Sequence, residues 1–129
     1  MDRSEMEAFI EKFYAARVEG DMAALGESFS GNARFQIAGS PEFSMLAALA
    51  EGHEAVMGLM RTIADTIAFE EFAVLDGVID GGKAAIRWRA TVHLVTSGQS
   101  YTTELADFLE LEEGKLVSCT EFLDTALAG

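Results

Sequence analysis

The chain is poor in cysteine, proline, histidine and basic residues. Its 129 residues include one cysteine, one proline, two histidines and nine lysines and arginines, against 22 aspartates and glutamates. The single cysteine, Cys119, excludes an intrachain disulfide. The net charge of −13 argues against binding to nucleic acid or to an anionic membrane, because both need clustered lysine and arginine. Two histidines without HxH or HExxH spacing predict no metal site.

Long apolar runs and glycine-rich loops are also missing. No apolar stretch approaches the ~18 residues of a membrane span, and residues 1–5 lead into an amphipathic pattern instead of an apolar signal segment. No glycine-rich loop of the phosphate-binding kind is present, so we expect no nucleotide and no other cofactor. Together with the lone thiol, these features favour a cytoplasmic, reducing location.

The residues that are present predict one domain over 1–129, since half of them are hydrophobic and this length supports a single core. A capping box at Ser4 and Glu7 predicts a first helix that ends at Gly20, and Asp21 caps a short second helix. A third helix is expected over 52–65. The segment 38–51, which holds Pro41, is interpreted as a loop with a helical turn. Strands are predicted at 33–37, 68–79, 83–96, 101–112 and 116–123.

This element order, α-α-β-α-β-β-β-β, predicts an α+β fold. Strands grouped after helices favour helices on one face of an antiparallel sheet. Strands longer than the usual five or six residues should twist and curl. We therefore expect a cone-shaped, cystatin-like sheet wrapped around three helices, with a pocket between the layers.

Two carboxylates fall on the face of the last strands that is otherwise apolar. Alternation puts Asp107 and Glu121 inward. A carboxylate in such a place costs several kcal/mol unless it is paired or protonated. The same face carries Trp88, Ala90, Val92, Leu105, Leu109 and Cys119, and we expect the pocket wall to be completed by Phe13, Phe35, Ile37, Leu59 and Met60.

The turns decide how these strands pair. A two-residue loop at Gly98-Gln99 would place Ala90 opposite Asp107, Val92 opposite Leu105 and Trp88 opposite Leu109. A three-residue loop with Gly114 in the left-handed region would place Cys119 opposite Asp107 and keep Glu121 inside. The alternative is a two-residue turn, which forces Glu113 to positive φ and turns Thr120 inward in place of Glu121.

The pair has two interpretations. In the first, Asp107 and Glu121 are a catalytic acid and base, because burial and mutual repulsion raise at least one pKa. In the second, they are a structural pair that shares a proton and bonds to the Trp88 indole or to water. The remaining candidates are read as structural: His53 as an exposed or capping residue, and Cys119 as a small packed thiol.

The opposite face of the sheet mixes charges with aromatic residues. The predicted register pairs Arg87 with Glu110 and His93 with Glu104. Phe108 and Phe122 lie on this face too, so we expect a homodimer through the outer sheet surface.

Several segments resemble the nuclear-transport-factor-2-like superfamily. They are Phe13–Asp21 on the first helix, Gly52–Val56 at the start of the third, Asp107–Val117 in the last hairpin and the ending Glu121–Asp124. The resemblance covers nearly the whole chain and is closest to ketosteroid-isomerase-like and SnoaL-like polyketide-cyclase members.

The resemblance implies different site residues from different members. The oxyanion aspartic acid of steroid isomerases falls at Asp107, but their tyrosine donor falls at Phe13 and their general base at Ile37, so standard steroid isomerisation is not expected. Tyr14 is next along the helix, rotated by about 100°. Limonene-epoxide-hydrolase-like members have two carboxylates that match Asp107 and Glu121, but their bridging arginine falls at Leu105. SnoaL-like cyclases rely on a pocket aspartate, which Asp107 would supply.

The sequence therefore predicts a cofactor-independent enzyme-like protein that binds a mostly apolar small molecule. Isomerisation, cyclisation, dehydration and epoxide opening are all open, with Asp107 and Glu121 as the acid/base pair. The alternative is a non-catalytic ligand-binding or dimerisation module of the same fold. A deep pocket holding both carboxylates favours the enzyme, whereas a pocket filled by Trp88, Phe13 and methionines favours the module.

Overall fold

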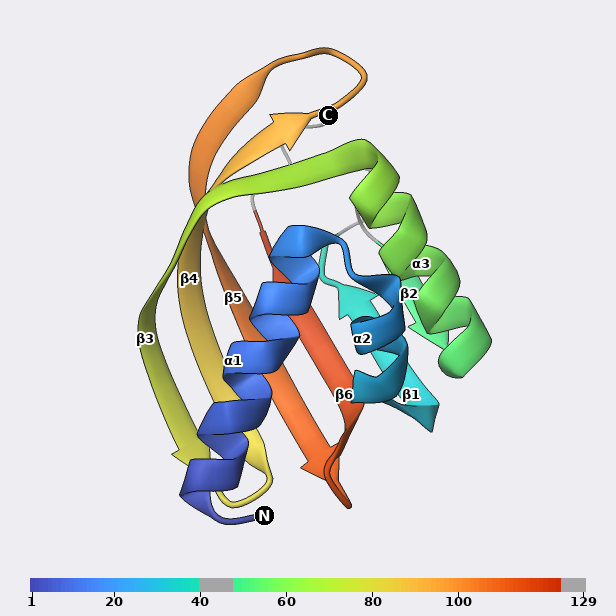
Figure 1. Ribbon diagram of the computed structural model, residues 1–129, viewed down its shortest axis with the longest axis vertical. Coiled ribbons are helices and arrows are strands. Elements are labelled where there is room, and N and C mark those ends of the chain that lie inside the picture. The colour runs from blue at the N-terminus through green and yellow to red at the C-terminus, as the bar shows by residue number, and fades with distance from the viewer. Residues whose placement is uncertain (40–47, 124–129) are drawn as a thin grey trace.

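A curved sheet with helices packed on its concave face forms the architecture (Figure 1). The computed structural model describes residues 1–39 and 48–123. Within these residues the elements are α1 (Arg3–Glu19), α2 (Met22–Ser28), β1 (Phe29–Ile37), β2 (Ala48–Glu51), α3 (His53–Thr66), β3 (Ile67–Asp80), β4 (Lys83–Leu94), β5 (Ser100–Glu112) and β6 (Lys115–Phe122). The predicted α+β cone is confirmed.

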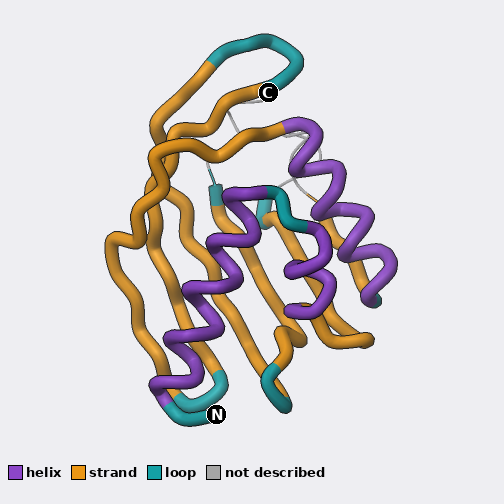
Figure 2. The backbone as a smooth tube through the Cα atoms, viewed as in Figure 1, coloured by secondary structure: helices purple, strands orange, loops and turns teal. Residues whose placement is uncertain are grey.

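The described strands make a six-stranded sheet in the order β2-β1-β6-β5-β4-β3. All neighbouring pairs are antiparallel except β1 and β6, which run parallel, so the sheet is mixed at this one junction. The short strand β2 lies in the segment that the sequence predicted to be a loop, and residues 40–47 of that segment lie outside the described residues. The backbone trace shows β3, β4 and β5 bending across the helices at one end of the cone (Figure 2).

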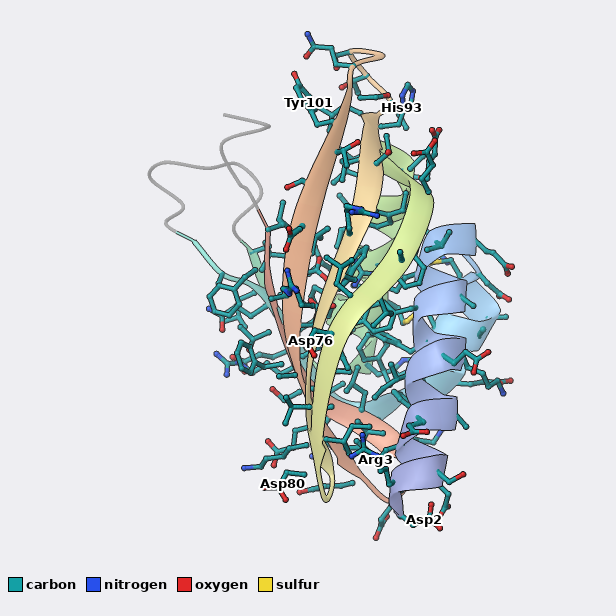
Figure 3. The ribbon with its side chains drawn as sticks, turned by 90° about the vertical axis from the view of Figure 1, so that its left-hand side faces the viewer. Asp2, Arg3, Asp76, Asp80, His93 and Tyr101 are labelled. Atoms are coloured by element: carbon teal, nitrogen blue, oxygen red, sulfur yellow. The ribbon has the colours of Figure 1, made fainter. Side chains whose placement is uncertain are left out.

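Helix α1 starts two residues earlier than predicted. Asp2, not Ser4, is the N-cap, and its side chain accepts a hydrogen bond of 2.8 Å from the Glu5 backbone while Glu5 completes the capping box. The Asp2-x-x-Glu5 spacing is the same signal as the predicted one, and aspartate caps as well as serine. Gly20, at φ 69°, ends the helix as expected, and Asp21 caps α2. These caps fix the two ends of α1, which runs along the sheet (Figure 3).

The register of β4 against β5 differs from the prediction by four residues. Pairing begins at His93 and Ser100, because the loop between the strands is longer than two residues and closes through a hydrogen bond of 2.8 Å from the Leu94 amide to the Gln99 carbonyl. Asp107 consequently lies opposite Ile86, where Ala90 was expected. In the same register, Trp88 lies opposite Leu105, Val92 opposite Tyr101 and Leu109 opposite Ala84. Since four is an even number, every predicted inward side chain stays on the inner face.

The turn between β5 and β6 is the tight one. Glu113 (φ 52°) and Gly114 (φ 79°) both occupy the left-handed region, so the prediction of a three-residue loop was wrong. This turn by itself would point Thr120 inward. A bulge at Val117 inserts one extra residue into β6 and reverses the outcome, because the pairing changes at this point. Glu121 therefore faces inward, as predicted, and pairs with Asp107 across the strands.

The predicted charge pairs on the outer face were wrong, because they rested on the incorrect register between β4 and β5. Arg87 forms its ion pair with Glu104, at 2.7 Å, and not with Glu110. His93 lies opposite Ser100, not Glu104, with Nδ1 2.8 Å from the serine hydroxyl; Figure 3 places it near one end of the sheet. Phe108 and Phe122 are 56% and 47% exposed, and their rings meet edge to face at 5.8 Å.

The buried core lies between α1 and the middle of the sheet. Trp88 is fully buried, with ring centroids 5.3–5.5 Å from those of Tyr14, Phe69 and Phe72. None of the described helices is long and apolar enough to cross a membrane. The aromatic packing fills the middle of the cone, and a cavity remains toward α3.

Candidate active site

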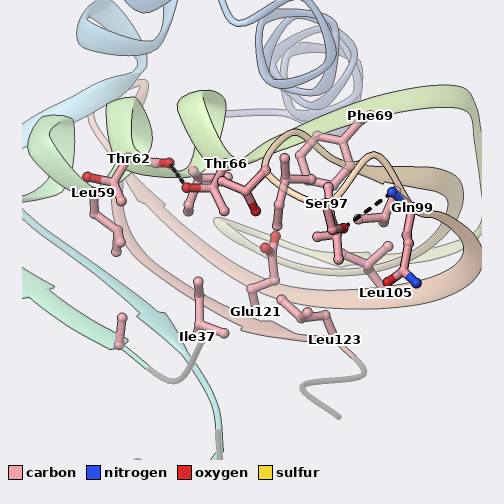
Figure 4. A pocket seen from close by; sticks show the side chains of 16 residues that line it. Ile37, Leu59, Thr62, Thr66, Phe69, Ser97, Gln99, Leu105, Glu121 and Leu123 are labelled. Carbon is pink, nitrogen blue, oxygen red and sulfur yellow. Dashed lines mark hydrogen bonds between the residues drawn. The ribbon is translucent and has the colours of Figure 1, made fainter. Parts of the chain in front are cut away.

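A cavity of about 560 Å³ opens between α3 and the concave face of the sheet (Figure 4). Its apolar wall consists of Ile37, Ala48, Leu59, Ile63, Ile67, Phe69, Val92, Leu94, Leu105 and Leu123. Its uncharged polar residues are Thr62, Thr66, Thr96, Ser97 and Gln99. Among the described residues that line it, Glu121 alone is charged, and Figure 4 shows its carboxyl group directed from β6 into the cavity. A mostly apolar space with one buried charge is typical of a small-molecule site.

Only part of the predicted pocket wall lines this cavity. Four of the predicted apolar wall residues lie on it, as does the predicted catalytic residue Glu121; the four are Ile37, Leu59, Val92 and Leu105. The others are buried in the core without lining the cavity: Phe13, Phe35, Met60, Trp88, Ala90, Leu109 and Cys119. The physical reason is that the concave face is longer than the cavity, and side chains of α1 fill its other half.

A buried ion pair holds Glu121 in place. Arg17 of α1 donates two hydrogen bonds, of 2.8 Å and 3.2 Å, to the two Glu121 carboxylate oxygens. The side chains are 2% and 1% exposed. Burial opposes ionisation of Glu121, but the charge and hydrogen bonds of Arg17 outweigh it and hold the pKa of Glu121 below its usual value. Glu121 is therefore an anion at neutral pH, matched by a guanidinium.

Aromatic rings enclose the guanidinium. The Arg17 Cζ atom lies 5.5 Å from the ring centroids of Phe35 and Phe69, and 6.0 Å from that of Trp88. These cation–π contacts replace some of the water that the cation loses on burial. Phe35 and Trp88, which are buried behind the cavity wall, therefore help to enclose the cation.

Asp107 lies behind Glu121, away from the cavity wall. Its Oδ2 atom accepts hydrogen bonds from the Tyr14 hydroxyl and, at 2.8 Å, from the Trp88 indole nitrogen. Burial raises the pKa of the Asp107 carboxyl well above its usual range. The charge of Glu121 and a hydrogen bond to it act in the same direction, against the weaker opposite effects of Arg17 and Tyr14. The predicted Trp88 bond is thus present, and Asp107 meets the cavity only through Glu121.

Tyr14 and Arg17 are the site residues that sequence reasoning missed. They stand three residues apart, so both project from one face of α1 toward the sheet. Burial, followed by the charge of Asp107, raises the pKa of Tyr14 well above its usual range, so its hydroxyl remains a donor. The signal was an arginine within the buried stripe of a helix, facing a sheet with two inward carboxylates. The expectation that the pair has no cation was wrong, because Arg17 of α1, and not position 105, supplies one, although it bonds Glu121 and does not bridge to Asp107.

The two residues read as structural have structural contacts. His53 Nε2 lies 2.8 Å from the Gly26 carbonyl oxygen and so joins the start of α3 to α2. Cys119 is fully buried, and burial raises the pKa of its thiol well above the usual range, which keeps it protonated and unreactive.

The ion pair allows a direct test by substitution. Arg17→Met leaves Glu121 buried without its cation, so we expect a loss of about 3–5 kcal/mol in the free energy of unfolding. Arg17→Met/Glu121→Met removes both charges and should recover most of that loss. Urea denaturation measures both variants. The control is Arg87→Met, which breaks an exposed pair and should cost no more than about 1 kcal/mol. Equal losses in the single and double variants would contradict the coupling.

The pH dependence of stability tests the state of Asp107. The Asn amide in Asp107→Asn can accept from Tyr14 and Trp88 and donate toward Glu121, so stability at pH 7 should stay within about 1 kcal/mol of wild type or exceed it. In the wild type, the raised folded-state pKa means that the unfolded chain ionises Asp107 first. Wild-type stability relative to the variant therefore falls as pH rises from the ordinary carboxyl pKa toward the raised one.

Denaturation series from about pH 5 to pH 8 give this difference. The lowered pKa of Glu121 has the opposite effect on stability, because the stability it contributes is lost as pH falls through the folded-state pKa. Both proteins keep Glu121, so this effect is common to them. A marked destabilisation by Asn, or a difference that does not change with pH, would mean that Asp107 is an ionised structural carboxylate.

Comparisons with known proteins agree on the fold. A comparison with curated proteins gives no significant match. Among solved structures, an NTF2-like protein of unknown function from Burkholderia pseudomallei has a TM-score of 0.82 and 20% identity, covering 98% of this chain and 95% of that one. An LEH-like epoxide hydrolase from M. tuberculosis has a TM-score of 0.76 and 13% identity, covering 94% and 84%.

A third structure is a hypothetical protein with a ketosteroid isomerase-like fold from Catenulispora acidiphila, in complex with trimethylamine. It has a TM-score of 0.71 and 16% identity, covering 88% of this chain and 82% of that one. At these identities the likeness shows the fold alone, and that fold is the predicted one. The family of the SnoaL-like domain matches residues 10–119. The chain therefore belongs to the SnoaL-like domain family.

Proposed function

We propose that this protein binds a mostly apolar small molecule in the cavity and carries out acid/base chemistry on it without a cofactor. The observation that carries the proposal is the position of Glu121. Among the described residues it is the charged side chain on the wall of the 560 Å³ cavity, and it pairs across the strands with Asp107 behind it. Proton transfer needs a titratable group in contact with the ligand and a site shielded from water, and Glu121 meets both conditions.

Glu121, Arg17 and Asp107 have different roles in this proposal. Glu121 accepts a proton from a ligand atom, and the same carboxyl group returns it to another atom, which is the common step of isomerisation, cyclisation and dehydration. Arg17 limits the basicity of Glu121, so the proton taken must already be acidic, as on a carbon next to a carbonyl group. Asp107 adjusts the charge of Glu121 through their shared hydrogen bond. In epoxide opening, Glu121 would accept the proton from a water molecule instead of from the ligand.

The comparisons support this proposal at the level of the fold. One similar structure is an LEH-like epoxide hydrolase and another is in complex with trimethylamine, so this architecture accommodates both an enzyme and a small ligand. Their low identity leaves the reaction of this chain to its own residues.

A second candidate is a non-catalytic ligand-binding module. The observation that favours it is that both carboxyl groups already have hydrogen-bond donors within the protein: Glu121 receives two hydrogen bonds from Arg17, and Oδ2 of Asp107 accepts from Tyr14 and Trp88. In this case Glu121 would orient a ligand and transfer no proton.

Exchange of carbon-bound protons separates the two candidates. The probe is 2-tetralone in deuterium oxide, with loss of its α-proton signal followed by NMR, and 2-naphthol fluorescence reports binding to the same cavity. We expect catalysed exchange, slowed by about tenfold or more in Glu121→Gln. Because this variant leaves Arg17 unpaired, Arg17→Met/Glu121→Gln is measured beside it. Glu112→Gln, at an exposed strand position, is the control.

The possible results point in different directions. Binding of 2-naphthol without catalysed exchange would favour the binding module. Exchange that survives both Glu121 variants would place the chemistry elsewhere. Failure of both probes to bind would contradict the proposed function.

We propose further that two copies of the chain associate through the outer sheet face. Exposed Phe108 and Phe122 form one aromatic patch there, next to the Arg87–Glu104 pair. Apolar patches bordered by charged residues are typical of protein interfaces.

Sedimentation tests this association. We expect a dimer at micromolar concentration, and Phe108→Ser/Phe122→Ser should dissociate it because the aromatic contacts are lost. The control is Val95→Ser, an exposed apolar position beyond the end of β4. A wild-type chain that sediments as a clean monomer would refute the dimer.

A further inference from the structure

The two oxygens of the Asp107 carboxyl group have unequal surroundings. Oδ2 accepts from two donors, the Tyr14 hydroxyl and the Trp88 indole nitrogen. Oδ1 is buried, and no donor of the described residues reaches it. A buried carboxylate oxygen without a donor is costly, whereas a protonated oxygen in the same place needs an acceptor instead.

The neighbours of Asp107 leave one acceptor for that proton. From α1, Tyr14 donates to Oδ2 of Asp107 and Arg17 donates to Glu121, so neither can accept the proton. From β6, Cys119 and Glu121 face it, and burial keeps the Cys119 thiol protonated. Strand β4 contributes Ile86 and Trp88, which do not titrate. Glu121, paired directly across the strands, is the anion that can accept from Oδ1.

We propose that Tyr14 and Trp88 are positioning residues that fix the proton of the Asp107–Glu121 pair on Oδ1 of Asp107. Glu121 then meets the cavity as an anionic acceptor and selects ligands that present a hydrogen-bond donor. The inference rests on the proposed ligand cavity and adds to it the class of ligand: an apolar molecule with a hydroxyl or protonated nitrogen at one end.

The selection follows from the cost of an unpaired buried acceptor. A ligand hydroxyl gives Glu121 a partner for a lone pair that Arg17 and Asp107 leave free. An ether of the same shape displaces water from the carboxylate without replacing its hydrogen bond, and a ligand carboxylate meets a like charge. The other polar residues of the wall, such as Ser97 and Gln99, are uncharged and do not counter this preference.

Infrared spectroscopy of the free protein tests the position of the proton. With the aspartates labelled by ¹³C, a protonated-carboxyl band should be visible at pH 7, when ordinary aspartates are ionised. Asp107→Asn should remove the band and so identify it. Tyr14→Phe should move it to higher wavenumber, because the carbonyl oxygen Oδ2 loses a donor. Tyr101→Phe removes a hydroxyl that bonds Gln99 and should leave the band unchanged.

Two outcomes overturn the position of the proton. One is the absence of a protonated aspartate band at pH 7, and the other is a band that Tyr14→Phe does not move. If Tyr14→Phe fails to fold, Trp88→Phe removes the second donor of the same oxygen, and the band must move likewise.

Matched probes test the ligand class. We expect wild-type protein to bind 2-naphthol about tenfold or more tightly than 2-methoxynaphthalene, which has the same rings but no donor. Tyr14→Phe should reduce this ratio, although Tyr14 does not line the cavity. Equal binding of the two probes overturns the selection while leaving the cavity as a ligand site. Binding of neither contradicts the proposed function itself, and the infrared band then still decides the position of the proton.

Discussion

The buried ion pair between Arg17 and Glu121 is the constraint on which the rest of the structure depends. Removing an ion from water costs several kcal/mol, and that cost is offset only where the partner is fixed in good geometry. Two hydrogen bonds from α1 to β6 meet this condition. The pair therefore sets the position of the first helix on the sheet and holds a carboxylate at the cavity wall. A helix displaced along the sheet would leave both charges unmatched.

The ion pair also accounts for the way in which the cone is divided. The rings of Phe35, Phe69 and Trp88 surround the guanidinium, and Tyr14 packs against Trp88 to reach Asp107. This aromatic packing excludes water from the charges and fills the part of the concave face beneath α1. The part beneath α3 is left open and is lined mainly by aliphatic side chains. One interaction thus produces both a dry network and an adjoining cavity.

Within the SnoaL-like domain family, this site combines a common fold with its own arrangement of charges. The positions that the resemblance gives to a tyrosine donor and a general base hold Phe13 and Ile37, and Ile37 is part of the apolar cavity wall. The cation that the resemblance places on a strand comes from the first helix. An arginine on a helix reaches the inner face from the opposite side, so it binds one carboxylate end-on and acts on the other only through its charge. Function in this fold therefore has to be argued from the site, residue by residue.

The sequence by itself determined the types of most elements, the inward faces of β4 and β5 and the inward direction of Asp107. These properties are local: caps such as Gly20 and Asp21 end and start helices, and period-two alternation does not depend on the partner strand. The prediction that Asp107 faces inward survived a register error of four residues between β4 and β5, because an even displacement preserves the face.

Tertiary structure alone decided which groups meet. The tight turn at Glu113 and the bulge at Val117 have opposite effects on the face of Glu121, and only strand pairing shows that both occur. Arg17 and Tyr14 lie on a different element from their partners, 104 and 93 positions away along the chain. Contacts over such distances depend on how a helix docks on a sheet, and docking is set by packing of the whole core, which no local pattern encodes.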